Sequence, residues 1–167
     1  LNIRRPPRST PELATILYTT LIRTVTLTGT QTIAENAAGV ATITATLSFA
    51  TTVPTVVTVA YTGTATNGTD YVASSTTITI PANSTTGTVT IDPIDDIIFE
   101  GDETVVIDIT NVTGGNGATE ATPAQQAIVT IADNDLTPSF TITGNTATEG
   151  TPVTFTATLS GPSSTDT

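Results

Sequence analysis

Six carboxylate side chains lie within one stretch of twelve residues, with no basic residue beside them in the sequence. The stretch begins at Asp92 and ends at Glu103, and its acidic residues are Asp92, Asp95, Asp96, Glu100, Asp102 and Glu103. Two like charges about 4 Å apart repel by roughly 4 kcal/mol at an effective dielectric constant of about 20. Carboxylates that converge therefore need a counter-ion. Calcium suits them, because it accepts the irregular sets of about six to eight oxygen ligands that loops provide.

A second acidic cluster, Asp133-Asn134-Asp135, follows the last segment with a strand pattern. The first stretch lies between two apolar segments, so it is a loop at one end of the predicted fold. In an antiparallel β-sandwich, segments that follow alternate strands reach the same end. We therefore expect the two clusters to come together and form an oxygen-rich cation site.

The charges are divided along the chain. All four basic residues lie in the first 23 positions, whereas fourteen of the fifteen acidic residues follow them. A surface without cations does not hold nucleic-acid phosphates or anionic lipid, so we expect no nucleic-acid partner. No apolar run is long enough for a membrane-spanning helix, so we expect no direct membrane insertion. The plainer interpretation of scattered carboxylates, a surface kept soluble by charge, stays open.

Catalysis is disfavoured by the residues that the chain lacks. It contains no His and no Cys, so neither a Ser–His nor a Cys–His catalytic pair is available. A glycosidase needs opposed carboxylates in a sugar cleft lined by aromatic side chains, and the chain has three Tyr, four Phe and no Trp. We predict that the protein is not an enzyme.

Alternation of apolar and polar residues predicts strands and no helix. Apolar residues recur at every second position in seven short segments, which are residues 25–27, 41–47, 57–61, 78–80, 89–91, 105–109 and 127–131. Turn signals such as Asn67-Gly68 separate them. The predicted fold is all-β, an immunoglobulin-like Greek-key β-sandwich of about seven strands.

The first 23 residues differ from the rest, because they contain every basic residue and have no strand pattern. One interpretation is the remnant of a secretion signal. The other, which we favour, is a foreign segment that resembles translated sequencing-adapter DNA. Under either interpretation, residues 1–23 are expected to have no stable place in the fold.

An internal repeat follows the main domain. The heptapeptide that begins at Thr42 recurs with one substitution at Thr154, 112 residues later, and a Glu precedes each copy, at Glu35 and Glu149. We predict a domain at residues 24–135. We assign residues 136–167 to a linker and the incomplete start of a second repeat, which is poorly anchored because two strands cannot bury a face.

Five motifs resemble the Calx-beta domain, a family found in sodium–calcium exchangers, integrin β4 and many bacterial surface proteins. The motifs are Ile33-Ala34-Glu35-Asn36, Gly63-Thr64-Ala65, Gly68-Thr69-Asp70-Tyr71, the run from Ile94 to Glu103, and Thr130-Ile131-Ala132-Asp133-Asn134-Asp135. The resemblance covers residues from about 25 to 135 and implies a calcium cluster. The implied ligands are the side chains of Glu35, Asp70, Asp95, Asp96, Glu100, Glu103, Asp133 and Asp135, with the main-chain carbonyl of Ile98.

Two residues depart from a calcium-rich member of that family. Ile97 and Asn134 stand where that member has Asp, which implies fewer ions or weaker sites here.

The resemblance implies a non-enzymatic, calcium-stiffened module in a tandem array, with a role in adhesion or in the extracellular matrix. Its expected partners are calcium ions, neighbouring repeats, and other surface proteins or glycans. Its expected location is the cell surface or the extracellular medium of a bacterium. Two alternatives stay open: a metal-independent spacer of immunoglobulin type, and a calcium-sensing regulatory domain of a larger membrane protein or enzyme.

Overall fold

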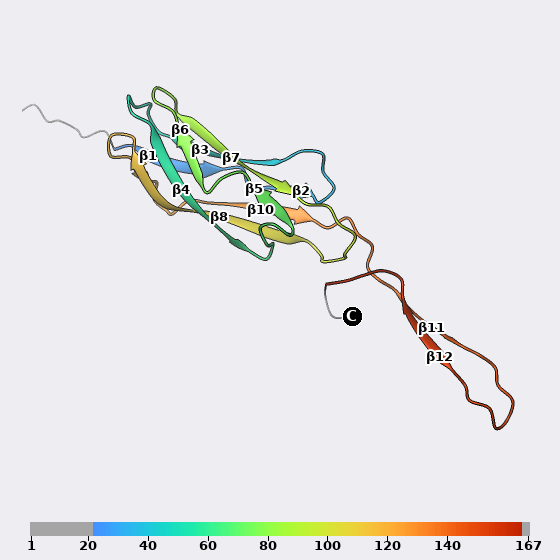
Figure 1. Ribbon diagram of the computed structural model, residues 1–167. Coiled ribbons are helices and arrows are strands. Elements are labelled where there is room, and N and C mark those ends of the chain that lie inside the picture. The colour runs from blue at the N-terminus through green and yellow to red at the C-terminus, as the bar shows by residue number, and fades with distance from the viewer. Residues whose placement is uncertain (1–21, 165–167) are drawn as a thin grey trace, which may run out of the picture.

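The computed structural model describes residues 22–164, which form a β-sandwich followed by a projecting two-stranded hairpin (Figure 1). The strands are β1 (Thr24–Thr28), β2 (Gln31–Ala34), β3 (Ala41–Leu47), β4 (Thr55–Gly63), β5 (Tyr71–Ala73), β6 (Thr77–Ile80), β7 (Thr86–Pro93), β8 (Glu103–Gly114), β9 (Thr119–Glu120), β10 (Gln126–Ala132), β11 (Phe140–Gly144) and β12 (Phe155–Leu159). Among the described residues, none belongs to a helix of the length and apolarity that crossing a membrane requires.

Two five-stranded sheets make up the sandwich, in the orders β5-β7-β3-β1-β9 and β2-β10-β8-β4-β6. The consecutive strands β1 and β2 belong to different sheets, since β1 pairs with β3 and β2 pairs with β10. The chain changes sheets at Gly29, whose φ is 121°. A Cβ there would lie 2.4 Å from the carbonyl oxygen of Thr42, so both the backbone angle and the close approach require glycine.

The core lies between the sheets and consists of the inward residues of the alternating segments. Val25, Ile43, Val57, Ile91 and Ile107 have no exposed surface. The all-β sandwich predicted from the sequence is confirmed, and each of the seven predicted segments lies in a strand.

The sandwich also contains three short strands that alternation did not predict: β2, β5 and β9. Each lies at the edge of a sheet and is two to four residues long. An edge strand this short places few side chains in the core, so it leaves too little alternation to detect.

Strand register brings the acidic segments to one end of the sandwich. Ala34 at the end of β2 pairs with Ala132 at the end of β10, and Ile131 pairs with Glu103 at the start of β8. Tyr71 at the start of β5 pairs with Pro93 at the end of β7. The residues that immediately precede or follow these positions therefore share one pole, which we call the acidic end.

The hairpin β11–β12 projects beyond the acidic end (Figure 1). Its strands pair with each other from Phe140–Leu159 to Gly144–Phe155, and every residue of both strands is exposed. Of the N-terminal segment 1–23, residues 1–21 lie outside the described residues. Ile22 is 75% exposed, and the carbonyl of Arg23 accepts a hydrogen bond of 3.0 Å from the N–H of Thr119.

Candidate metal centre

Three carboxylates from distant parts of the chain form the first group at the acidic end. Glu35, Asp96 and Asp135 each offer an oxygen within 4.8 Å of the others. Glu35 directly follows β2 and is held by its own N–H, which donates to the carbonyl of Ala132 at 2.9 Å. Its Oε1 accepts the N–H of Asp96 at 3.2 Å. The β2–β10 pairing thus positions Glu35 beside the loop that follows β7.

A second group consists of Asp70, Glu100 and Glu103, whose carboxylate oxygens also lie within 4.8 Å of one another. Asp70 precedes β5, and its Oδ2 accepts the N–H of Thr66 at 2.6 Å. Its carbonyl accepts the N–H of Ile94 at 2.9 Å, which fixes the start of β5 against the acidic loop.

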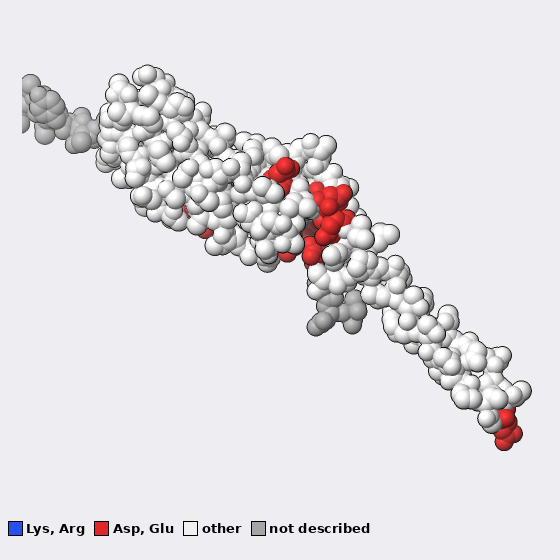
Figure 2. Space-filling model, viewed as in Figure 1, with Lys and Arg blue, Asp and Glu red and all other residues white. Residues whose placement is uncertain are grey.

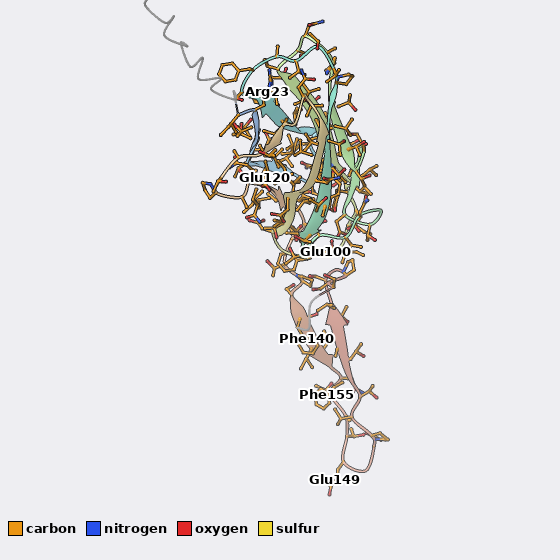
Figure 3. The ribbon with its side chains drawn as sticks, turned by 90° about the vertical axis from the view of Figure 1, so that its left-hand side faces the viewer. Arg23, Glu100, Glu120, Phe140, Glu149 and Phe155 are labelled. Atoms are coloured by element: carbon orange, nitrogen blue, oxygen red, sulfur yellow. The ribbon has the colours of Figure 1, made fainter. Side chains whose placement is uncertain are left out.

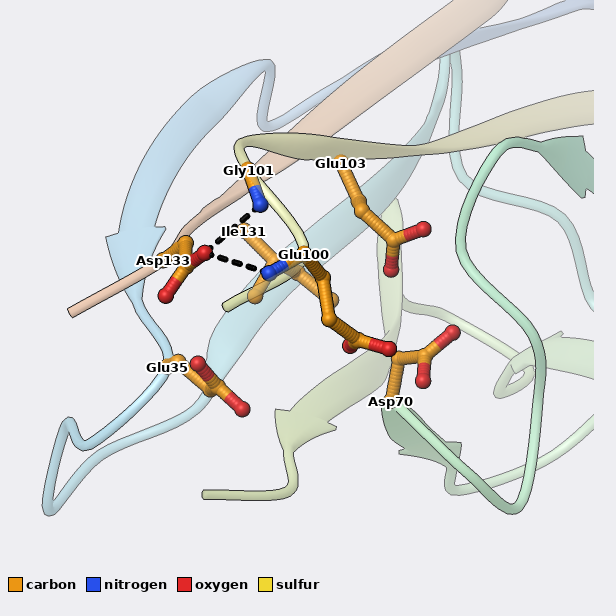
Figure 4. Close-up of a pocket in the computed structure, with 7 residues that line it drawn as sticks. All are labelled: Glu35, Asp70, Glu100, Gly101, Glu103, Ile131 and Asp133. Atoms are coloured by element: carbon orange, nitrogen blue, oxygen red, sulfur yellow. Dashed lines mark hydrogen bonds between the residues drawn. The ribbon is translucent and has the colours of Figure 1, made fainter. Parts of the chain in front are cut away.

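Asp133 lines a pocket together with Glu35 of the first group and with Asp70, Glu100 and Glu103 of the second (Figure 4). Its Oδ2 accepts the N–H groups of Glu100 at 2.7 Å and Gly101 at 2.6 Å (Figure 4). Its Oδ1 accepts the N–H of Asp135 at 2.7 Å. One carboxylate therefore ties the acidic loop to the chain that leaves β10.

Burial and mutual repulsion raise the pKa of several of these carboxyl groups. Burial, followed by the charge of Asp70 and a hydrogen bond to it, raises the pKa of Glu103 to about 7. Burial also raises the pKa of Glu35 and Glu100, and the charges of neighbouring aspartates add to the effect. Without a cation, the centre resists carrying its full negative charge.

Asp133 behaves in the opposite way. Burial alone would raise its pKa, but the backbone N–H groups of Asp135, Gly101 and Glu100 outweigh burial and hold the pKa below its ordinary value. Asp133 is therefore charged when its neighbours tend to hold protons, and it is the anionic anchor of the centre.

The ligand atoms that these residues offer suit a hard divalent cation. Every side-chain ligand atom in the two groups is a carboxylate oxygen, the type of ligand that calcium prefers. Oδ2 of Asp135 is buried and has no hydrogen-bond partner. Arg23 is the single basic residue among residues 22–164, and it lies at the opposite end of the sandwich from Glu100 (Figure 3). In the space-filling view, acidic residues gather where the sandwich meets the hairpin (Figure 2).

Seven of the nine residues predicted as ligands belong to the two groups or join them. Asp95 and Ile98 lie in neither group. Asp95 is exposed. The pKa of Asp135 is raised by its own burial first, then by the charge of Asp133, and then by the charge of Asp95. Ile98 is half-buried, and its N–H donates to Oδ1 of Asp96 at 2.7 Å.

The sequence did not point to the backbone groups that shape the centre. Gly101 has a φ of 78° and places its N–H on the same oxygen that Glu100 contacts. A glycine inside the acidic stretch was the available signal for this turn. Asp102 is exposed, and its Oδ1 accepts the N–H of Asp133 at 3.3 Å.

The comparison with known families concerns the whole domain that carries this centre. The sequence profile of the Calx-beta domain matches residues 21–135. The chain belongs to the Calx-beta domain family. Comparison with curated protein sequences gives no match.

Solved structures share the Calx-beta fold. The apo form of the Calx CBD1 domain is 28% identical, with a TM-score of 0.58 over 68% of this chain and 99% of that one. The calcium binding domain CBD12 of CALX1.1 is 28% identical, with a TM-score of 0.57 over 70% of this chain and 49% of that one. CBD12 from CALX1.2 is 27% identical, with a TM-score of 0.56 over 66% of this chain and 45% of that one. The chain thus spans nearly the whole of CBD1 but less than half of each of the two CBD12 chains.

Proposed function

We propose that this Calx-beta domain binds calcium at its acidic end. The observation that carries the proposal is the pair of carboxylate groups, Glu35–Asp96–Asp135 and Asp70–Glu100–Glu103, each with its oxygens within 4.8 Å and with no basic side chain in the described chain near them. Repulsion between uncompensated carboxylates is relieved when a divalent cation binds. Support comes from the related CBD12 structure, which is described as a calcium binding domain.

The ligand roles follow from the two groups. Asp133 bridges them, and its lowered pKa keeps it anionic and ready to bind metal. The remaining predicted ligands, Asp95 and the carbonyl of Ile98, belong to the acidic loop between Asp92 and Glu103 and complete the proposed oxygen set.

The proposed role of calcium is mechanical. Asp135 directly precedes the linker at Leu136, and the hairpin β11–β12 follows the linker. A cation shared by Glu35, Asp96 and Asp135 would join the β2 end, the acidic loop and the start of the linker. The domain would then be a non-catalytic, calcium-stiffened module in an array on a bacterial surface or in the extracellular medium.

Titration calorimetry with Asp96→Asn and Asp92→Asn tests the site. Asp96 belongs to a carboxylate group, whereas Asp92 is an exposed β7 residue outside both groups. Asn retains the Oδ1 that accepts the Ile98 N–H, so Asp96→Asn removes charge without removing this turn contact. We expect calcium binding to weaken at least about ten-fold in Asp96→Asn and to be unchanged in Asp92→Asn.

The same samples are then melted with calcium and with chelator. The proposal is wrong if chelator leaves the wild-type melting temperature unchanged and the calorimetric titration shows no heat of calcium binding. If calcium binds the wild type but weakens equally in both variants, the protein is still a calcium-binding protein. The assignment of Asp96 as a ligand is then wrong.

A further inference from the structure

Strand β8 extends beyond one of the two strands that pair with it. The ladder between β8 and β10 ends where Gln126 pairs with Asp108. On its other side, β8 continues to pair with β4 as far as Gly114, which lies opposite Thr55. Residues 109–114 therefore have a strand partner on one side only, although β8 is an inner strand of its sheet.

A side chain ends the pairing of β10. The register would place Gln125 opposite Ile109 as the next pair of the ladder. The N–H of Gln125 donates to Oε1 of Glu120 instead. Thr104 turns its carbonyl towards β4, where it accepts the N–H of Ala65, and successive residues of a strand alternate between its two edges. Ile109 therefore faces the β10 side, and Glu120 keeps this edge of β8 open.

A second unpaired edge lies beside the first. Strand β9 pairs with β1 and is the last strand of its sheet, so its other edge has no strand partner. The hollow between the two edges, which we call the edge groove, has a volume of ≈ 230 Å³. It is lined by Ile109, Thr110, Asn111 and Val112 of β8 and by Thr119 and Glu120 of β9. Small-molecule pockets typically measure about 300–1,000 Å³, so this narrower groove suits an extended chain.

The edge groove combines apolar side chains with a single charge. Ile109 and Val112 are half-buried and pack against the core, whereas Thr110 and Thr119 are exposed. Glu120 is half-buried, and no basic side chain among residues 22–164 forms an ion pair with it. The groove therefore matches a ligand that carries an apolar side chain next to a cation.

A β-bulge limits the length of chain that the groove can accept. The β4–β8 register shifts between Thr58 and Val59, which pair with Asn111 and Ile109, so Thr110 is an extra residue. Bulges interrupt the regular edge that a long strand needs, and they occur beside binding sites. The edge groove thus favours a short peptide segment over a whole strand from a second copy of this sandwich.

We propose that the edge groove binds a short, extended, basic peptide segment of a partner protein by strand addition. The peptide pairs with the backbone at Ile109, places an apolar side chain on Ile109 and Val112, and directs a Lys or Arg side chain to Glu120. The formal net charge of −11 attracts such a segment from a distance. Glu120 lies on the flank of the sandwich between Arg23 and Glu100 (Figure 3), and the proposal does not depend on the proposed calcium function.

Amide exchange in the full chain tests whether the edge is open. Ile107 lies within the β8–β10 ladder opposite Ala127, whereas Ile109 lies beyond its end. We expect the Ile109 amide to exchange at least about ten-fold faster than the Ile107 amide. Equal protection of the two amides in a dilute sample would overturn the proposal. Protection of Ile109 that appears only at high protein concentration would assign the edge to a second copy and would also overturn it.

Three synthetic peptides test what the groove binds. The first has about six residues, the usual length of a strand, and alternates Val and Thr around one central Lys. The second replaces Lys with Glu, and the third keeps Lys but carries backbone N-methyl groups that remove the N–H donors. We expect the first to bind at least about ten-fold more tightly than either of the others at low salt, and to slow exchange of the Ile109 amide. Equal affinities, or binding that leaves Ile109 unprotected, would contradict strand addition.

A matched pair of variants tests the charge. Glu120→Gln keeps the Oε1 that accepts the Gln125 N–H and removes the carboxylate, whereas Glu149→Gln removes a charge at the hairpin tip (Figure 3). We expect Glu120→Gln to weaken binding of the Lys peptide at least about three-fold and Glu149→Gln to leave it unchanged. Equal weakening would show attraction to the net charge alone and overturn the site. Calcium titration of Glu120→Gln should match the wild type, so failure of the groove and failure of calcium binding are told apart.

Discussion

The chain forms the same two-stranded ladder twice, once inside a sandwich and once outside one. In the main domain, Leu47 of β3 pairs with Val25 and is 1% exposed. In the hairpin, Leu159 of β12 pairs with Phe140 and is 41% exposed. The two ladders have the same register, and each ends with a pair of hydrogen bonds, between Ser48 and Thr24 in the domain and between Ser160 and Ser139 in the hairpin. Pairing of the two strands therefore depends on local sequence. Burial requires a facing sheet, and among the described residues only the main domain has one.

The two glutamates that precede the repeated heptapeptide differ in the same way. Glu35 is 7% exposed, among the carboxylates of the acidic end. Glu149 is exposed at the hairpin tip, away from any other labelled carboxylate (Figure 3). A residue type at an equivalent place in a repeat becomes a candidate ligand only where tertiary structure surrounds it with others.

The largest effect expected from this contrast concerns the two leucines. We expect Leu47→Ala to lower the free energy of unfolding by about 2–5 kcal/mol, because it removes a fully buried side chain and leaves a cavity. Leu159→Ala is expected to change it by less than about 0.5 kcal/mol, as at other exposed positions. Denaturant melts of the full chain measure both. A comparable loss in Leu159→Ala would mean that the hairpin face is covered in solution.

The next effect concerns the two glutamates and calcium. Calcium at 100 times its dissociation constant should stabilise the wild type by about 2.7 kcal/mol. Glu35→Gln should lose most of this gain, whereas Glu149→Gln should keep it. Without metal, Glu35→Gln should be no less stable than wild type, because burial and neighbouring charges disfavour the Glu35 carboxylate. Thermal melts with calcium and with chelator test each statement, and a calcium response lost in Glu149→Gln would contradict the contrast.

The smallest effect is the pH dependence of the metal-free chain. The pKa of Glu103 rises from 4.5 to about 7 on folding, so the folded state binds more protons than the unfolded state between these values. Stability contributed by this group is present below about pH 4.5 and is lost as the pH rises through about 7. Melts in chelator should therefore show a melting temperature that falls over this window.

Glu103→Gln is the matched control, because it cannot titrate. The fall in melting temperature should be smaller in Glu103→Gln than in the wild type. With calcium present the trend should reverse, since protons compete with the cation for the same oxygens. An identical pH profile for both chains in chelator would show that Glu103 is not the titrating group.

Alternation predicted the strands because each inward residue of a long strand leaves a mark in the sequence. Ala41, Ile43, Ala45 and Leu47 are all buried, as their spacing requires. The cluster of acidic residues was equally evident in the sequence, because the stretch from Asp92 to Glu103 contains no basic residue that could neutralise it. The edge strands β2, β5 and β9 were not predicted, since each contributes too few core residues.

The sequence by itself determined that the protein is an all-β sandwich and that it carries clustered carboxylates without basic partners. Only the tertiary structure decided how those carboxylates are grouped. Glu35 meets Asp96, 61 residues away in the chain, because β2 pairs with β10 and its end lies against the acidic loop. The return of residues 162–164 to Phe99 was likewise settled by tertiary structure. The contacts of residues 162–164 with Phe99 join backbone groups, which are nearly the same in every residue type, so composition and spacing carry no record of them.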